Sequence, residues 1–242
     1  MSNQEPMEKP IVTIITVVKN GEKHLESTIQ SVINQSYDKI EYIIIDGGST
    51  DGTLDIIRKY ENFISYWISE PDRGLYDAMN KGWRLASENS YILFLGAGDK
   101  IIQLPDFSKN NEPTLAIWGR VMIEDSKIYN SAADFRLKLG NTLHHQALLI
   151  SKSLSIQPPF NTRYKVYADY DFNCRLLNQG VKFQFSEDFI SYASPAGVSG
   201  KLSLKESLQV VKINFGFVWT FLSILYHLYQ GFKYGFHRLS FK

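Results

Sequence analysis

The chain has 242 residues, 44% of them hydrophobic, and a net charge of +1, which describes an ordinary globular protein with a substantial core. Its single cysteine, Cys174, excludes an internal disulfide framework and a cysteine-based zinc site, and fits a reducing compartment. The first ten residues are polar and acidic with no apolar run, so no signal peptide is expected.

Strand-like and helix-like segments alternate over the first hundred residues. Apolar, β-branched runs predict four strands, at 11–17, 40–45, 64–68 and 91–95. Apolar residues at helical spacing predict three intervening helices, at 22–35, 53–60 and 75–86. Because crossovers between parallel strands are right-handed, this order predicts an α/β fold: a Rossmann-like, mostly parallel sheet flanked by helices.

Polar residues follow the carboxyl ends of these strands. In an open α/β sheet all such ends lie at one edge, where ligands bind. The residues expected to converge there are Thr16, Asn20, Asp46, Asp51, Asp72, Arg73 and Asp99. No G-x-G-x-x-G or G-x-x-x-x-G-K-[ST] motif is present, and acids suit ribose, a base N–H or a divalent metal better than phosphate. The crevice is therefore predicted to bind a nucleotide whose phosphates are held by a metal.

The fourth strand ends in the segment YILFLGAGD, residues 91–99. Three small residues let a ligand approach closely, and a carboxylate, Asp99, follows at once. Asp99 is well placed to hold a metal; a turn cap is the alternative.

The pattern is looser after residue 100. Segments 114–119 and 120–123 are expected strands, and 144–150, HHQALLI, is an expected strand entered by two histidines. In a strand His144 and His145 would face opposite sides, so a zinc site is not expected there.

Residues 168–176, ADYDFNCRL, are predicted to be helical. Asp171 and Arg175 are spaced i, i+4 and are expected to form a structural ion pair. Asp169 lies about 200° around the helix from Asp171 and is not committed to that pair. It stands at the helix start, where the dipole favours an ionised carboxylate. A helix cap is the alternative to a chemical role.

The tail, residues 201–242, differs in charge from residues 1–200. It holds six basic residues and one acid, which leaves 20 basic and 24 acidic residues in the body. Residues 213–232 carry no formal charge and seven aromatics. From Lys212 onward, residues spaced three or four apart form one narrow polar stripe on an otherwise apolar helix: Lys212, Gly216, Thr220, Ser223, His227 and Gln230.

An amphipathic helix with basic flanks is typical of a segment lying in a membrane interface. The alternatives are a helix packed on the rest of the chain or across a homodimer. Nucleic acid is not an expected partner, because the tail lacks clustered arginines among its aromatics.

Four motifs, in this order, resemble family 2 glycosyltransferases with the GT-A fold: TIITVVKN, YIIIDGGSTDGT, SEPDRGLYDAMNKG and LFLGAGDK. The resemblance covers about residues 10–195 and is strongest to small bacterial enzymes that build capsule, O-antigen and colanic-acid repeat units. It implies an inverting hexosyltransferase that moves a sugar from a nucleotide-sugar to an acceptor hydroxyl. Residues 10–100 would form the nucleotide-sugar half and residues 101–200 the acceptor half. A lipid-linked acceptor would place this cytoplasmic enzyme peripherally on the inner face of the cell membrane.

The resemblance also implies roles for the donor-side residues. Thr16 would lie where the first strand meets the nucleobase, Asp46 would accept from the base, and Asp51 would support that loop. Arg73 and Asp77 would face the donor, with Asn80 and Lys81 toward its ribose or diphosphate. Asn20 is grouped with these donor-binding residues.

The remaining implied roles concern the metal, the base and the acceptor. Asp99 matches the last acid of the Asp-x-Asp motif for Mn²⁺ or Mg²⁺, although Ala97 replaces the first acid. Asp169 matches the catalytic base, which takes the proton from the acceptor hydroxyl. His145 and Gln146 would lie on the acceptor side. A nucleotidyltransferase and a non-catalytic partner subunit remain alternatives.

Overall fold

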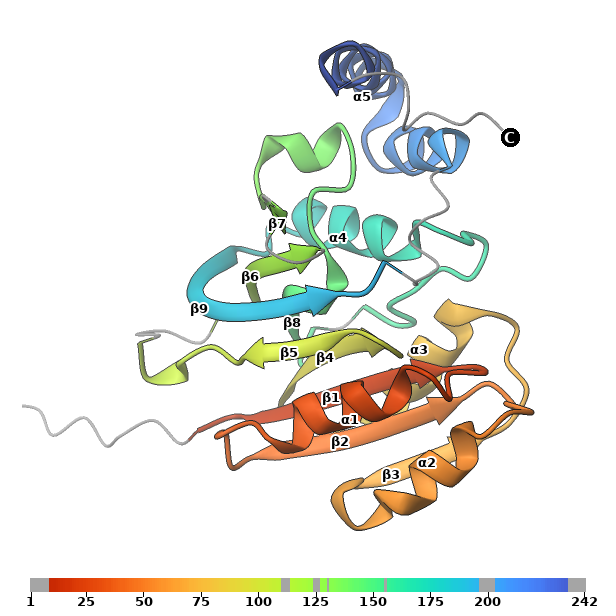
Figure 1. The fold of residues 1–242 in the computed structure, drawn as a ribbon. Coiled ribbons are helices and arrows are strands. Elements are labelled where there is room, and N and C mark those ends of the chain that lie inside the picture. Colours follow the sequence, from red (N-terminus) through yellow and green to blue (C-terminus); the bar gives the residue numbers. More distant parts are fainter. Residues whose placement is uncertain are drawn as a thin grey trace, which may run out of the picture.

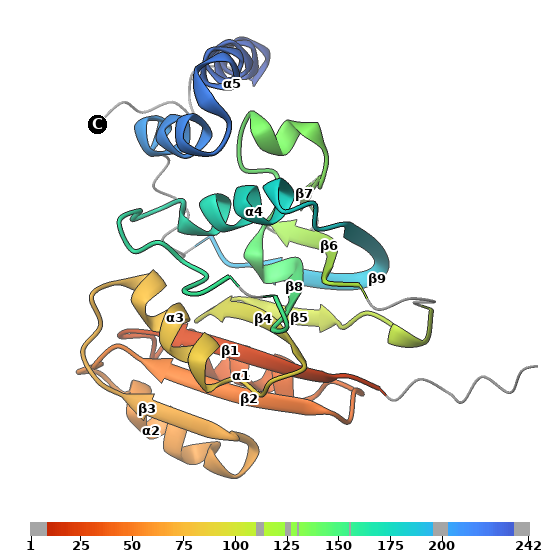
Figure 2. The same ribbon diagram turned by 180° about the vertical axis from the view of Figure 1, so that it is seen from behind.

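The computed structural model describes residues 9–109, 114–123, 127–129, 131–154, 156–195 and 203–234. Segment 1–8, where no signal peptide is expected, lies outside these ranges. So do the boundary expected at residue 200 and the basic residues Lys201, Arg238 and Lys242. Within the described ranges the chain forms one curved sheet with helices on both faces, and a long C-terminal helix lies at one end (Figures 1 and 2).

The N-terminal half has the predicted β-α-β-α-β-α-β order. Its strands are β1 (Ile11–Val18), β2 (Ile40–Asp46), β3 (Tyr66–Ser69) and β4 (Ser90–Gly96), all parallel in the order β3-β2-β1-β4. Its helices are α1 (Leu25–Ile33), α2 (Thr53–Lys59) and α3 (Leu75–Leu85). Helices α1 and α2 cover one face of the sheet and α3 covers the other (Figures 1 and 2). The parallel α/β prediction is confirmed here.

Two predicted boundaries shift for local reasons. Helix α1 starts at Leu25 rather than at 22, because the Gly21 carbonyl accepts the N–H groups of His24 and Leu25 in a turn. Strand β3 starts at Tyr66 rather than at 64, because a 3₁₀ turn, η1 (Glu61–Phe63), precedes it.

The C-terminal half extends the sheet with mixed pairing. Its strands are β5 (Lys100–Gln103), β6 (Ala116–Ile123), β7 (Lys127–Tyr129), β8 (Leu148–Ser151) and β9 (Phe183–Ala193). Strand β8 runs antiparallel between β4 and β6, and β9 runs parallel to β6. Strand β5 pairs antiparallel with β9 at the far edge, and β7 pairs antiparallel with β6. The sheet as a whole is therefore mixed, and the two strands expected at 114–119 and 120–123 are one strand, β6. Two further 3₁₀ turns, η2 (Phe107–Lys109) and η3 (Phe135–Lys138), lie between these strands.

The strand expected at 144–150 is wrong in its first part. Residues His145–Ala147 form a 3₁₀ turn, η4, and β8 begins only at Leu148. The argument that His144 and His145 face opposite sides of a strand therefore fails. Both histidines line the same pocket, described below.

Helix α4 (Ala168–Asn178) shares one core with α3 and β4. The fully buried Trp83 of α3 stacks on Phe94 of β4 at a ring distance of 6.4 Å and meets Phe172 of α4 edge-on at 6.0 Å. Aromatic packing of this kind fixes neighbouring elements closely, because interiors tolerate little change in volume. Helix α4 is thus held against α3 and β4.

The last helix, α5 (Leu204–Tyr234), is kinked at Gly216, whose φ of 83° is not helical. The helix expected in the tail is therefore present, but it is divided into two arms at Gly216. The arm before the kink packs on α4 through the buried Val210 and Val211. In the arm after it, Ser223 is buried and donates to the Leu139 carbonyl at 2.6 Å.

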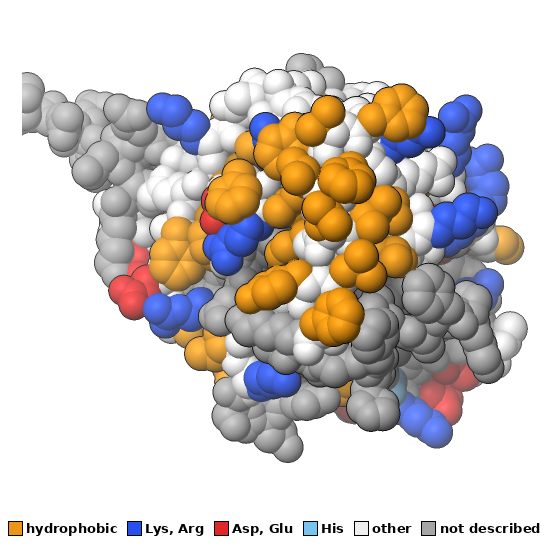
Figure 3. All heavy atoms as spheres, turned by 90° about the horizontal axis from the view of Figure 1, so that it is seen from above, with side chains coloured by type: hydrophobic (Ala, Val, Ile, Leu, Met, Phe, Trp, Pro, Cys, Tyr) orange, Lys and Arg blue, Asp and Glu red, His pale blue; other side chains and the backbone are white. Residues whose placement is uncertain are grey.

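The outer surface of α5 is apolar. Figure 3 shows hydrophobic side chains gathered at the α5 end of the molecule, with lysine and arginine side chains around them. The most exposed are Phe217 and Phe232, both 77% exposed. By length and composition, Leu204–Phe232 is long and apolar enough to cross a membrane, since an 18-residue window within it reaches a mean hydropathy of 1.5.

Candidate active site

The loop after β2 is built around Asp46. This carboxylate is fully buried and accepts hydrogen bonds from the N–H groups of Gly48 and Ser49. It also accepts from the hydroxyls of Ser49 and Ser69, at 2.5 and 2.6 Å. Asp46, expected to meet the nucleobase, is thus placed where it holds the 46–52 loop at the edge of the crevice.

Asp51 and Asn20 tie this loop to the turn after β1. The Asp51 carboxylate accepts from the N–H groups of Glu22 and Thr53 and from the Thr53 hydroxyl, and the Thr53 hydroxyl bond is the main reason that its pKa is lowered. Asn20 has a left-handed φ of 53°, and its Oδ1 accepts from the Thr50 N–H at 2.9 Å. The contacts of Asp51 are those of a loop support, the role expected of it.

Two expected donor residues face the interior instead. Thr16 is fully buried, and its hydroxyl lies 3.0 Å from that of Tyr42. Asn80 exchanges two hydrogen bonds with the backbone of Phe160, at 2.8 and 3.0 Å. The structure therefore does not bring these two side chains to the surface of the crevice.

The third motif forms a rigid turn at the mouth of the crevice. Lys81 is paired with Asp72 at 2.6 Å and with Glu70 at 2.8 Å, which together hold its pKa above the ordinary value although burial opposes this. Asp77 accepts from the backbone N–H of Arg73 at 3.1 Å and from its guanidinium at 3.3 Å. The Arg73 side chain is 88% exposed, so most of it remains open to a ligand.

Asp169, at the first turn of α4, lies in the wall of a pocket. Its Oδ1 accepts from the Tyr170 N–H at 2.8 Å and from the Tyr76 hydroxyl at 3.1 Å. The same Tyr76 hydroxyl also donates to the Val166 carbonyl. Oδ2 of Asp169 lies 3.4 Å from Nδ1 of His145. The residue is 8% exposed, so its carboxylate is oriented by neighbours yet accessible from the pocket. Asp171 pairs with Arg175 at 3.0 Å, as the helical spacing predicted.

Asp99, after β4, is held more tightly. Oδ1 accepts from the Ser194 N–H at 2.8 Å, and Oδ2 accepts from the Gly96 N–H at 2.8 Å and from Nε2 of Gln146 at 3.2 Å. The residue is 5% exposed, and burial raises the pKa of its carboxyl despite these donors and the nearby His145. The carboxylate therefore points inward from the end of the strand.

One turn, η4, links the two carboxylates. Its first residue, His145, contacts Asp169, and its second, Gln146, donates to Asp99. Burial alone would lower the pKa of His145, but the Asp169 carboxylate, with a contribution from Asp99, outweighs burial and holds that pKa above its ordinary value. A positively charged imidazole between two acids is thus favoured. The sequence placed both residues on the acceptor side but did not indicate this bridge.

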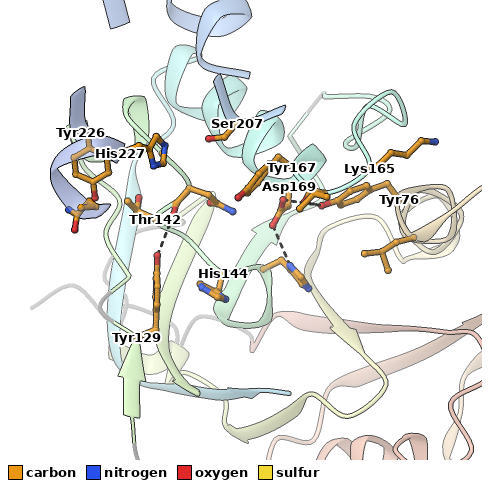
Figure 4. Close-up of a pocket in the computed structure, with 16 residues that line it drawn as sticks. Tyr76, Tyr129, Thr142, His144, Lys165, Tyr167, Asp169, Ser207, Tyr226 and His227 are labelled. Atoms are coloured by element: carbon orange, nitrogen blue, oxygen red, sulfur yellow. Dashed lines mark hydrogen bonds and ion pairs between the residues drawn. The ribbon is translucent and has the colours of Figure 1, made fainter. Parts of the chain in front are cut away.

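The pocket beside Asp169 has a volume of about 380 Å³ (Figure 4). Asp169 and Tyr76 lie on one side of it, and Tyr226 and His227 of α5 lie on the other. Its size falls within the roughly 300–1,000 Å³ that is usual for small-molecule sites. The other lining side chains include Tyr129, Thr142, His144, Lys165, Tyr167 and Gln230.

Glu206, in the first turn of α5, is a contributor that the sequence did not reveal. Its carboxylate accepts from three successive backbone N–H groups just before α4, those of Lys165, Val166 and Tyr167, at 2.5, 2.7 and 3.0 Å. Unpaired N–H groups here would cost about 1–3 kcal/mol each if buried. Glu206 therefore fixes the approach to Asp169 from 37 residues away in the chain.

The fit of a divalent metal rests on Asp99. Within the described ranges, no group of three or more His, Cys, Asp or Glu side chains is arranged to hold a metal ion. Each carboxylate oxygen has two lone pairs, and Oδ1 of Asp99 has one hydrogen-bond donor, so one position is left for a cation. Asp99 thus fits a metal as a single protein ligand, with the remaining ligands supplied by the substrate and water.

Comparisons with known proteins identify the family of this chain. The family model described as "Glycosyl transferase family 2" matches residues 13–101. A "PGL/p-HBAD biosynthesis glycosyltransferase" of Mycobacterium bovis is 31% identical over 219 residues, which cover 84% of each chain. A "Putative teichuronic acid biosynthesis glycosyltransferase TuaG" of Bacillus subtilis is 39% identical over 95 residues, 38% of this chain and 37% of that one.

Two solved structures share the fold. The S. aureus protein TarS (residues 1–349), in complex with UDP-GlcNAc, superposes with a TM-score of 0.66 at 14% identity, covering 93% of this chain and 73% of that one. The mannosyltransferase PcManGT from Pyrobaculum calidifontis, in complex with GDP-Man and Mn²⁺, superposes with a TM-score of 0.61 at 17% identity, covering 96% and 77%. Both are GT-A glycosyltransferases, so the GT-A prediction for the fold is confirmed.

The contact between His145 and Asp169 predicts a shifted titration. The pKa of His145, measured by NMR, is expected above about 6.5 in the wild type and below it in Asp169→Asn, where only the weaker contribution of Asp99 still opposes burial. Because the folded-state pKa is raised, the pair stabilises the fold fully below about pH 6.5, and this contribution is lost as pH rises through the raised pKa. Asp171→Asn on the same helix is the control. An unchanged pKa in Asp169→Asn would contradict the assignment.

Proposed function

The chain belongs to glycosyl transferase family 2, and from this premise we propose that it is an inverting enzyme that moves one sugar from a nucleoside-diphosphate sugar to an acceptor hydroxyl. The observation that carries the proposal is the pair of buried carboxylates, Asp99 and Asp169, bridged by η4 beside a pocket. Relatives named for glycolipid and teichuronic acid biosynthesis support a surface glycan as the product.

Asp169 is proposed as the general base. In inverting transfer, the acceptor oxygen bonds to the anomeric carbon while the bond from that carbon to the diphosphate breaks. The acceptor proton passes to Asp169, and the nucleoside diphosphate leaves. Tyr76 and the Tyr170 N–H fix one carboxylate oxygen, and His145 lies beside the other. A base positioned in this way typically contributes about 10²–10⁴-fold to the rate.

The donor is proposed to bind at the strand ends of the N-terminal half. The loops after β2 and β3 are held there by Asp46, Asp51 and Lys81, which orders the backbone before a ligand arrives. Arg73, largely exposed beside Asp77, is the cation available for the diphosphate. Solved neighbours with UDP-GlcNAc and GDP-Man support a nucleotide-sugar in this half of the fold.

Asp99 is proposed to hold a divalent cation, Mn²⁺ or Mg²⁺, through Oδ1, which accepts a single hydrogen bond. When bound, such a cation neutralises charge that develops on the departing diphosphate. Gln146 and the N–H groups of Gly96 and Ser194 keep the carboxylate in one orientation. The complex of PcManGT with GDP-Man and Mn²⁺ supports a metal in this fold.

The acceptor is proposed to be lipid-linked, with the enzyme peripheral on the cytoplasmic face of the membrane. The outer surface of α5 supports this, because it exposes Phe217, Phe221 and Phe232 together. Lys212 lies over the Phe217 ring at 4.8 Å, and Lys138 over the Trp219 ring at 4.9 Å. Apolar side chains rimmed by cations suit an anionic lipid surface.

Asp169→Asn should retain donor binding and lose about 10²–10⁴-fold in transfer rate, because the carboxamide keeps the shape but cannot take the proton. Release of nucleoside diphosphate from the nucleotide-sugar measures the reaction. Release of pyrophosphate would instead indicate a nucleotidyltransferase. Asp55→Asn, which changes a surface carboxylate, is the control. Full turnover by Asp169→Asn would remove the base assignment.

Binding of UDP or GDP should raise the melting temperature, and Mn²⁺ should increase the shift. A ligand at about 100 times its Kd stabilises by about 2.7 kcal/mol. In Asp99→Asn the Mn²⁺-dependent increment should disappear while the shift from nucleotide alone remains. An increment that survives this substitution would show that Asp99 is not the metal ligand.

The double variant Phe217→Ser/Phe221→Ser should bind vesicles at least about tenfold more weakly than the wild type, because burial of two phenylalanine side chains is lost. Co-sedimentation with phosphatidylglycerol vesicles measures binding, and pure phosphatidylcholine should bind less protein because it lacks the anionic charge. Phe63→Ser is the matched control, since Phe63 lies on the opposite half of the fold and is 61% exposed, as Phe221 is. Equal binding by the double variant and this control would refute docking through α5.

A further inference from the structure

The second arm of α5 faces two environments. Its outer side is exposed and apolar. Its inner side carries Ser223, the consecutive pair Tyr226 and His227, and Gln230, which fall on one helical face. Ser223 anchors this face to the Leu139 carbonyl. Tyr226, His227 and Gln230 line the pocket that also holds Asp169 (Figure 4). The polar stripe of the tail is thus directed at the pocket and the protein body.

One ring nitrogen of His227, in the α5 wall of the pocket, lacks a hydrogen-bond partner within the described part of the chain. This nitrogen, Nε2, is buried. The other buried side-chain atoms without a partner belong to residues outside the pocket lining. Burial also lowers the pKa of His227, so at neutral pH the ring is neutral and can donate from one nitrogen and accept at the other. An unpaired buried group of this kind costs about 1–3 kcal/mol, which a ligand hydrogen bond would remove.

The rest of the lining suits a carbohydrate. Four tyrosines surround the space, Tyr76, Tyr129, Tyr167 and Tyr226, and offer flat apolar faces with polar edges. Asn141, Thr142, His144 and Gln230 add hydrogen-bonding groups. Aromatic walls with a few polar groups are the usual composition of a small-molecule site, and a sugar ring presents both apolar C–H faces and hydroxyls.

We propose that the inner face of α5 is the outer wall of the acceptor subsite, where His227, Tyr226 and Gln230 bind a glycoside at the head of the acceptor. The inference rests on the proposed function, because the subsite is defined by its position beside the base, Asp169. It adds that one helix serves both membrane and acceptor: the outer side of α5 meets lipid, and its inner side holds the head group presented there. The α5 residues therefore determine which acceptor is used.

The test uses the full chain with UDP-GlcNAc and GDP-mannose as donors and a panel of hexyl and 4-nitrophenyl glycosides as acceptors. For the best acceptor, His227→Ala and Gln230→Ala should each raise the acceptor KM about tenfold or more and leave the donor KM unchanged. Tyr229→Ala, on the exposed side of the same arm, should change neither. His227→Gln should restore much of the affinity, because its amide reaches the position of Nε2.

The outcomes separate the two levels of the proposal. Failure of the wild type to bind or hydrolyse any donor would overturn the proposed function, and this inference with it. Donor hydrolysis without turnover of any glycoside would overturn the glycoside assignment alone. Unchanged acceptor KM in His227→Ala and Gln230→Ala, or equal losses in Tyr229→Ala, would overturn the role of the inner face. If His227→Ala proves unfolded by circular dichroism, His227→Gln and Gln230→Ala decide the question.

Discussion

The site depends on a single short turn that satisfies two buried carboxylates. Asp99 ends the parallel half of the fold, Asp169 begins α4, and both acids are almost fully buried. Two like charges in a poorly hydrated site raise each other's free energy unless a donor or cation lies between them. In η4, His145 and Gln146 supply one partner each. The turn therefore gives each of the two buried acids a partner, and its own position is fixed by β8 pairing with β4.

Several of the residues expected to touch the donor also make hydrogen bonds that order the crevice. Asp46 makes hydrogen bonds within the loop after β2, and Lys81 makes them to the loop after β3. Asn80 makes hydrogen bonds to the Phe160 backbone. Because these loops are already ordered, they lose little conformational entropy when a ligand binds, and the net binding free energy is more favourable. Arg73, which is left largely exposed, is then the side chain with most freedom to meet a phosphate.

The sequence was sufficient for the parallel half because each strand and helix there has a clear local period, and right-handed crossovers leave little choice of topology. It also placed Asp169 at a helix start and paired Asp171 with Arg175, since both follow from helical spacing. It could not reveal η4, because HHQALLI has the apolar content of a strand. Nor could it reveal that Tyr76 meets Asp169 across 93 residues or that Glu206 caps the approach to α4. Such contacts depend on tertiary packing, which has no local pattern.

The sequence of the tail also could not show which way the polar stripe of α5 faces. A narrow polar stripe on an apolar helix is equally consistent with polar groups that face water and with polar groups that face a protein. The kink decides between them. At Gly216 the backbone turns through a left-handed φ that a side chain would disfavour, so the two arms can take separate directions. The first arm packs along α4 and places Glu206 against the backbone N–H groups just before α4. The second arm lies over η3 with its polar side inward. A straight helix anchored on α4 could not follow both directions, so Gly216 is what lets one apolar helix expose a lipid-compatible surface and still line the pocket beside Asp169.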